Sequence, residues 1–144
     1  MDAGQTDEVA ALRALLLAGQ RFRRAMADHF NLSLSETVLL GHLADAGGQL
    51  APSELVHRML IGSGTLTSVI DRLVADGYVS RCPDADDRRR VQVRLTPAGR
   101  NTVRFAQTHL HRALSRSSGG SAAALSSLAA ELDDETERVR KQRR

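Results

Sequence analysis

The sequence predicts a mainly α-helical protein that carries one small β-hairpin, and three observations support this fold class. Aromatic residues make up only 3% of the chain against 42% hydrophobic residues, so the core must be built from Leu, Val, Ile and Ala. That composition favours helices over strands, in which aromatic residues are enriched. Apolar residues recur at steps of three and four along several long segments, as on one face of a helix. Two short β-type runs, residues 78–82 and 91–95, stand on either side of a charged loop.

Residues 7–46 contain the patterns of two helices. The first extends for roughly 20 residues, with apolar positions at helical spacing. These positions are Val9, Leu12, Leu15, Leu16, Phe22 and Met26. The segment 32–35 interrupts the pattern, and we expect Ser35, followed by Glu36, to cap a second helix that ends before the glycine pair at 47–48.

Residues 52–76 predict a short helix, a tight turn and a second helix. Pro52 suits a first helical position, because its missing N–H costs nothing there. Gly62-Ser63-Gly64 supplies turn chemistry and a cap, and Gly77 ends a second helix expected at 65–76. The buried side of that helix is expected to consist of Leu66, Val69, Ile70, Leu73 and Val74. This order of elements is the helix-turn-helix arrangement, whose second helix enters the major groove of DNA.

The outer face of that second helix is small, rich in hydroxyl groups and carries an arginine. Such groups offer hydrogen bonds to phosphates and base edges in a major groove about 12 Å wide. We therefore expect DNA contacts from Ser63, Thr65, Thr67, Ser68 and Arg72. For this helix taken alone, an ordinary amphipathic helix with a solvated face is an equally good interpretation.

The loop between the two β-type runs, residues 83–90, is too charged to pack inward. It is therefore expected to project into solvent as the tip of a hairpin, and three consecutive arginines occupy its end: Arg88, Arg89 and Arg90. Arginines held there suit a minor groove, whose negative potential attracts them. Asp86 and Asp87 would repel phosphate, so we expect them to orient arginine guanidinium groups through paired hydrogen bonds. A solvated charge run is the alternative.

The C-terminal third predicts two more helices. Thr96 and Pro97 suit the cap and first position of a helix that runs toward Ser115. The segment 117–121, SSGGS, is expected to form a flexible joint before a last helix. In that helix apolar residues fall at nearly heptad positions: Leu125, Leu128, Leu132 and Val139.

These terminal helices have apolar seams and no local partner large enough to cover them. Soluble monomers rarely expose such seams, so we expect a homodimer in which the helices at both ends of the chain pack against their copies. An intrachain helical bundle is the alternative. A twofold dimer would hold two recognition helices about 34 Å apart, which predicts a palindromic target. The expected organisation is therefore a dimerisation helix at 1–31, a DNA-binding domain at 32–96 and dimerisation helices at 97–144.

Other classes of protein find little support in the sequence. The net charge of +3 permits nucleic-acid binding without proving it. Cys82 is the only cysteine, so no intrachain disulfide can form and a reducing cytoplasm is the expected setting. There is no signal-peptide pattern and no run of about 18 apolar residues, so no membrane association is expected. We identify no catalytic motif, no metal site and no cofactor site, and expect that the protein is not an enzyme.

Three stretches of the sequence form a set of motifs: G-x-L-T-x-x-I-D-R-L-V-x-D-G-Y-V-x-R from Gly64, D-x-D-D-R-R from Asp84, and V-x-V-R-L-T-P-A-G from Val91. Together they resemble the MarR family of bacterial winged-helix regulators. The resemblance implies a winged helix-turn-helix with its recognition helix at 64–76. It also implies that Arg88 and Arg89 are the wing arginines and that Asp71 braces the wing through Arg89. The sequence departs from the family at Ser68, where an arginine is common, which shifts the expected contacts toward Thr65, Thr67, Arg72 and the wing.

The resemblance also implies a biological role. It implies a transcriptional regulator, acting as a repressor, that binds double-stranded DNA as a homodimer. Such regulators often respond to a small phenolic or otherwise lipophilic effector between the dimerisation helices and the winged domain. The residues expected at such a pocket are Phe22, Met26, Phe30 and His42. The alternative function, kept open by Ser68, is a winged-helix module that binds another protein and has weak or no affinity for DNA.

Overall fold

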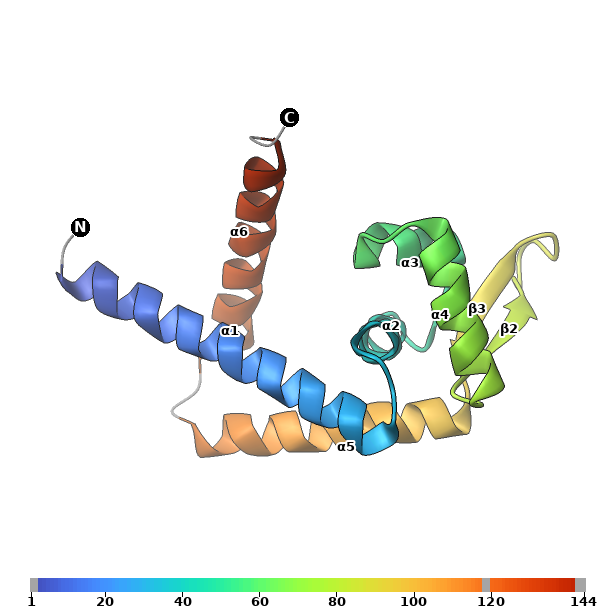
Figure 1. The fold of residues 1–144 in the computed structure, drawn as a ribbon, viewed down its shortest axis with the longest axis horizontal. Coiled ribbons are helices and arrows are strands. Elements are labelled where there is room, and N and C mark those ends of the chain that lie inside the picture. Colours follow the sequence, from blue (N-terminus) through green and yellow to red (C-terminus); the bar gives the residue numbers. More distant parts are fainter. Residues whose placement is uncertain (1–2, 118–119, 142–144) are drawn as a thin grey trace. The chain divides into compact units, whose positions relative to one another are not determined.

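The computed structural model describes residues 3–117 and 120–141, and their side chains except those of residues 3–5, 137, 139 and 140 (Figure 1). The chain divides into two units, Met1–Gln107 and Thr108–Arg144. The elements, in chain order, are α1 (Ala3–Phe30), α2 (Leu34–Asp45), β1 (Gln49–Leu50), α3 (Pro52–Met59), α4 (Ser63–Ala75), β2 (Val79–Pro83), β3 (Val91–Leu95), α5 (Pro97–Arg116) and α6 (Ala122–Lys141). No helix among the described residues is long and apolar enough to cross a membrane.

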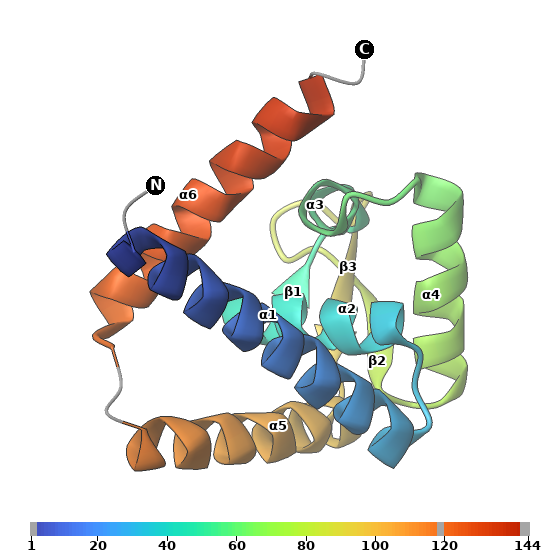
Figure 2. The same ribbon diagram turned by 60° about the vertical axis from the view of Figure 1, so that its left-hand side comes forward.

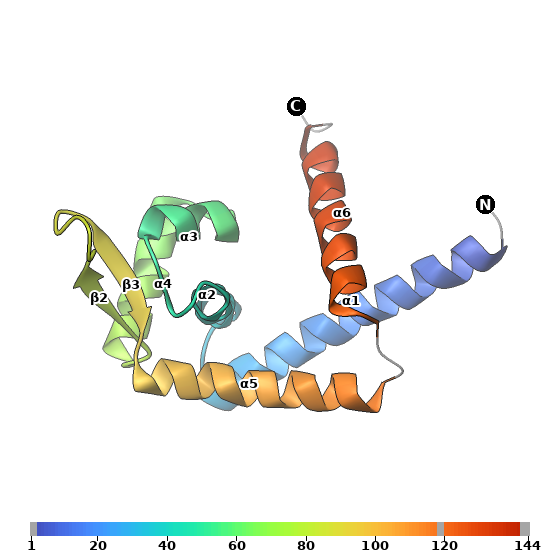
Figure 3. The ribbon, with the colours of Figure 1, turned by 180° about the vertical axis from the view of Figure 1, so that it is seen from behind.

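The strands form one small antiparallel sheet in the order β1-β3-β2. The hairpin of β2 and β3 pairs Val79 with Leu95 and Pro83 with Val91. The loop between them projects beyond α3 and α4 as a wing (Figure 3). The predicted fold class, mainly helical with a small hairpin wing, is confirmed. The two-residue strand β1 was not predicted, because a pair of residues shows no periodicity and its extended form depends on pairing with Arg94 and Val93 of β3.

Helix α2 begins with a capping box. Ser33 is the N-cap, and its hydroxyl accepts a hydrogen bond from the backbone N–H of Glu36 at 3.1 Å. In return, the Glu36 carboxylate accepts the backbone N–H of Ser33 at 2.7 Å. The predicted cap, Ser35, is wrong, because it lies inside the first turn. The sequence S-x-x-E at 33–36 is the capping-box pattern, in which the two side chains accept the backbone N–H groups of Ser33 and Glu36. This pattern determines where the helix starts.

The core of the first unit is aliphatic. Five side chains from α2, α3, α4 and β3 are 0% exposed: Leu39, Leu43, Leu55, Leu73 and Val93. Each such side chain contributes about 1.5–3 kcal/mol when removed from water. The predicted apolar stripe of α4 is buried as well, except that Val74 is half-buried. Figure 2 shows the strands behind α2, with α4 beside the sheet that it contacts. This packing fixes which face of α4 is left to solvent.

The wing is attached to α5 through Thr96. Its backbone N–H donates to the carbonyl of Tyr78 at 3.1 Å, and its hydroxyl donates to the carbonyl of Gly77 at 2.6 Å. The same hydroxyl accepts the backbone N–H of Gly99 at 3.1 Å, as an N-cap does. Thr96 therefore caps α5, as predicted, and also joins the end of β3 to the turn after α4.

Several helices expose large apolar side chains. In α1 these are Val9, Leu15, Leu16 and Leu17, and in the second unit they are Leu110, Leu114, Leu125 and Leu128, each at least 38% exposed. Helix α1 has 28 residues, longer than the roughly 20 expected. The joint expected at 117–121 includes residues 118–119, which lie outside the described residues, as does the side chain of Val139.

Candidate nucleic-acid interface

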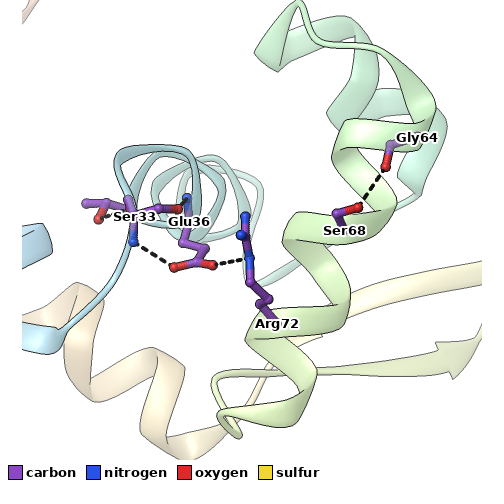
Figure 4. Close-up of polar contacts among 6 residues, drawn as sticks. Ser33, Glu36, Gly64, Ser68 and Arg72 are labelled. Atoms are coloured by element: carbon purple, nitrogen blue, oxygen red, sulfur yellow. Dashed lines mark hydrogen bonds and ion pairs between the residues drawn. The ribbon is translucent and has the colours of Figure 1, made fainter.

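Helix α4 presents all five predicted contact residues to solvent: Ser63, Thr65, Thr67, Ser68 and Arg72. The Thr67 hydroxyl donates to the carbonyl of Ser63 at 2.9 Å. The Ser68 hydroxyl donates likewise to the carbonyl of Gly64 at 3.3 Å (Figure 4). Because these hydroxyl protons are used within the helix, the oxygens face outward as acceptors. Acceptors in a major groove match the exposed amino groups of adenine and cytosine.

The N-terminus of α4 lacks a side-chain cap. Its N-cap is Gly62, with extended backbone angles of φ −66° and ψ 154°, and no side chain there accepts a backbone N–H. The first N–H groups of a helix have no partner inside the helix. Helix α4 therefore directs unsatisfied N–H groups and the positive end of its dipole outward, an arrangement that suits a phosphate.

Arg72, on the same outer face, is held by a buried acid. Its Nε lies 2.9 Å from Oε1 of Glu36, the residue that also caps α2 (Figure 4). The Arg72 side chain is 60% exposed, whereas that of Glu36 is only 6% exposed. From the sequence, Glu36 was expected next to the cap of α2, with no partner on another helix. The signal that was missed is its place in the capping box, which draws its carboxylate back toward the chain before α2.

Asp71 joins α4 to the wing, although not through the expected partner. Its carboxylate lies 2.6 Å from the guanidinium of Arg81 in β2, and both side chains are partly exposed. The pairing with Arg89 is wrong, because Asp71 pairs with Arg81 of β2, which packs against α4, while Arg89 lies in the loop after β2. The expectation that Asp71 supports the wing remains a prediction, with Arg81 as its partner.

The wing loop is shaped by Asp84, for which the sequence predicted no role of its own. Its carboxylate accepts the backbone N–H groups of Asp86 at 2.8 Å and Asp87 at 3.2 Å, and the side-chain amide of Gln92 at 2.5 Å. The hydrogen bond from Asp86, followed by those from Gln92 and Asp87, lowers the pKa of Asp84. Pro83 followed by an aspartate is a turn signal that would have identified it.

Asp87 contacts two arginines of the loop. Its carboxylate accepts the backbone N–H of Arg89 at 3.0 Å and lies 3.8 Å from Nε of Arg90. Asp86 contributes its backbone N–H to Asp84. Within the ranges 3–117 and 120–141, the side chains of Arg88 and Arg89 have no ion-pair partner and are exposed. Two cations are therefore available to a ligand at the wing tip.

The residues expected at an effector pocket lie on α1 and α2. Met26 belongs to the core at 6% exposure, whereas Phe22, Phe30 and His42 are half-buried. The ring of Phe30 meets that of Phe105 edge to face, with centroids 5.4 Å apart. Burial, aided by the charge of Arg58, lowers the pKa of His42. In the part of the chain that the structure describes, no three His, Cys, Asp or Glu side chains form a metal-binding group.

Comparison with known proteins identifies the same segment. The model of the MarR family matches residues 30–90. The HTH-type transcriptional regulator PecS of Dickeya dadantii (strain 3937) is 39% identical over 72 residues, which cover 49% of this chain and 43% of PecS. The HTH-type transcriptional regulator TtmR of Methylorubrum extorquens (strain PA1) is 36% identical over 90 residues, which cover 62% of this chain and 46% of TtmR. The matches therefore span less than half the length of these relatives.

Solved structures share the fold over nearly the whole chain. A cysteine-to-serine variant of MarR from E. coli, complexed with operator DNA, aligns with a TM-score of 0.54. The alignment covers 93% of this chain and 98% of that chain at 22% identity. The family match includes α2, α3, α4 and the wing loop, which are the elements that position every predicted DNA contact. The winged helix-turn-helix segment of this chain, residues 30–90, therefore matches the MarR family.

Proposed function

We propose that the protein is a transcriptional regulator that binds duplex DNA through α4 and the wing. The main supporting observation is that α4 exposes a hydroxyl-bearing face with an uncapped N-terminus and is joined by the Asp71–Arg81 pair to β2, the strand that leads into the wing loop. In that loop, Arg88 and Arg89 have no ion-pair partner among the described residues. The helix suits a major groove and the loop suits the adjacent minor groove. The names of PecS and TtmR, and the operator complex of MarR, support the same role.

We further propose that the protein acts as a homodimer on a palindromic operator. The supporting observation is the set of exposed apolar side chains on α1, α5 and α6, which a second copy would cover. A twofold dimer presents two copies of α4, and half-sites one DNA turn apart would match them. The expected setting is the cytoplasm.

We propose that the protein is a repressor that releases DNA when it binds a lipophilic effector. Phe22, Met26, Phe30 and His42 remain the candidate effector residues. An effector acts only if it favours one separation of the two recognition helices over the other, so its binding and DNA binding must be coupled.

The experiment that tests DNA binding is a salt titration with fluorescently labelled duplex of random sequence. Each neutralised phosphate contributes about −0.9 to the slope of log affinity against log salt. Arg89→Ala should reduce the steepness by about one and weaken binding on every sequence, while Thr65→Ala should instead change sequence preference. The control is Arg13→Ala, an exposed arginine in the first half of α1, which should leave the slope unchanged. Absence of binding even at low salt would refute the proposal and favour the protein-binding module.

A further inference from the structure

Glu36 is the buried charged side chain among the described residues, with only 5% of its surface exposed. Its carboxylate has two partners: one oxygen accepts the backbone N–H of Ser33 at 2.7 Å, and the other lies 2.9 Å from Nε of Arg72 (Figure 4). A buried carboxylate is costly unless it is paired and hydrogen-bonded. Both oxygens are satisfied here, so Glu36 is fixed in position.

The capping role alone does not require a charge. Glu54 performs it on α3, where its carboxylate accepts the backbone N–H of Ala51 at 3.1 Å. Glu54 is exposed and, over the described residues, has no ion-pair partner. A glutamine can serve the same function in a capping box. The negative charge of Glu36 is therefore explained by Arg72 rather than by the helix start.

The pair leaves most of the Arg72 guanidinium unused. Only Nε faces Glu36, and the side chain remains 60% exposed, so the two terminal nitrogens still have four N–H groups to donate. Arg72 shares the outer face of α4 with Thr65 and lies seven residues after it, about 10.5 Å along the helix axis. Residues near the start of a recognition helix contact base edges. Arg72, near the end of α4, is therefore placed for the sugar-phosphate edge of the groove.

We propose that Glu36 is a positioning residue for DNA binding: it holds Arg72 by Nε and directs the terminal nitrogens at a phosphate. A long arginine side chain normally loses conformational freedom when it makes a contact, and the pair with Glu36 removes that freedom beforehand. The inference rests on the proposed DNA-binding function. It is narrower than the expectation from sequence, which left Arg72 a contact to either phosphates or base edges, because a phosphate contact changes affinity without changing sequence preference.

The decisive variant is Glu36→Gln, which keeps a capping oxygen and removes the acceptor charge. If only long-range charge mattered, loss of a negative charge near DNA would strengthen binding. The positioning role predicts the opposite, an affinity that is roughly five- to tenfold weaker, which corresponds to the loss of one polar interaction of ordinary net strength. Glu54→Gln is the matched control: it makes the same chemical change in the other capping glutamate and should leave the affinity unchanged or slightly increased.

A double-mutant cycle separates positioning from a general structural effect. Arg72→Gln should weaken binding on all sequences and reduce the salt slope by about 0.9. In that background Glu36→Gln should have no further effect on affinity, because Glu36 acts through Arg72. Far-ultraviolet circular dichroism at the assay temperature shows that each variant is folded.

Two results would overturn the inference. One is an equal loss from Glu36→Gln with and without Arg72, and the other is tighter binding by Glu36→Gln alone. Failure of the proposed function looks different, since the unmodified protein itself would then not bind duplex DNA, and the role assigned to Glu36 would be lost with it.

Discussion

Replacement of Gly99 by alanine tests the packing that attaches the wing to the first turn of α5. Gly99 is buried, and a Cβ added to it would lie 2.1 Å from the carbonyl oxygen of Tyr78 and 3.1 Å from a methyl group of Leu95. Real Cβ contacts are essentially never shorter than 3.0 Å, so the atoms must separate by at least 0.9 Å, the difference between 3.0 and 2.1. The clashing atom is a backbone oxygen that also accepts the N–H of Thr96, so it cannot rotate away.

The magnitude follows from two opposing terms. Overpacking of a rigid site costs about 1–3 kcal/mol, and the backbone clash places Gly99→Ala at the upper end. Alanine in a helix recovers about 1 kcal/mol relative to glycine, which leaves a net loss of about 2 kcal/mol. Gly41, inside α2, is the matched control because a Cβ there meets nothing within 4 Å. Gly41→Ala should increase the free energy of unfolding by about 0.5–1 kcal/mol.

Urea denaturation followed by circular dichroism at 222 nm measures both variants. Protein concentration must be held constant, because the apparent stability of the proposed dimer would depend on it. The two alanine variants should differ by about 3 kcal/mol in the free energy of unfolding, with opposite signs relative to the unmodified protein. If Gly99→Ala is as stable as Gly41→Ala, the close approach of α5 to Tyr78 is not a feature of the folded protein.

Two further predictions concern pH. Burial, aided by Arg58, lowers the pKa of His42 from its ordinary 6.5, so the unfolded chain binds the proton more readily. The free energy of unfolding should therefore be greatest above pH 6.5 and decrease below it, and urea titrations of His42→Gln at two pH values should show a flatter dependence. The hydrogen bonds from Asp86 and Gln92 lower the pKa of Asp84 from 3.8, so its contribution is complete above that pH and is lost as the pH falls through the lower folded value. The amide resonance of Asp86 should report that acid transition, and Asp84→Asn should abolish it.

Much of the fold was predictable because it depends on local patterns. The buried stripe of α4 follows from apolar residues at helical spacing, and four of its five members are fully buried. Thr96 and Pro97 marked the start of α5 through capping chemistry. The L-T-P-A-G step that contributed to the family resemblance has a physical explanation here. Thr96 caps the helix, and Gly99 permits its close approach to Tyr78.

The parts of the candidate site that were missed depend on contacts between distant segments. Glu36 and Arg72 are on separate helices, and nothing in the residues around either one identifies the other. Arg81 follows Ser80 in a short strand, and its pairing with Asp71 appears only when β2 packs against α4. Sequence patterns therefore identified which face of α4 is exposed, but not which of its side chains already have partners.

The acidic residues around the candidate interface show why the net charge of +3 is a poor guide to DNA binding. Glu36 and Asp71 each pair with an arginine, and Asp84 accepts three hydrogen bonds within the wing. A carboxylate whose oxygens are directed at such partners contributes little repulsion toward an approaching phosphate, yet it fixes the backbone or guanidinium groups that face outward. Removal of any of these acids would increase the net positive charge but leave its former partner less ordered. For each of these acids, the structure predicts that the loss of order in its partner weakens DNA binding more than the added positive charge strengthens it. The reason is that the pairing is short-ranged, whereas the repulsion between the acid and phosphate is screened by salt.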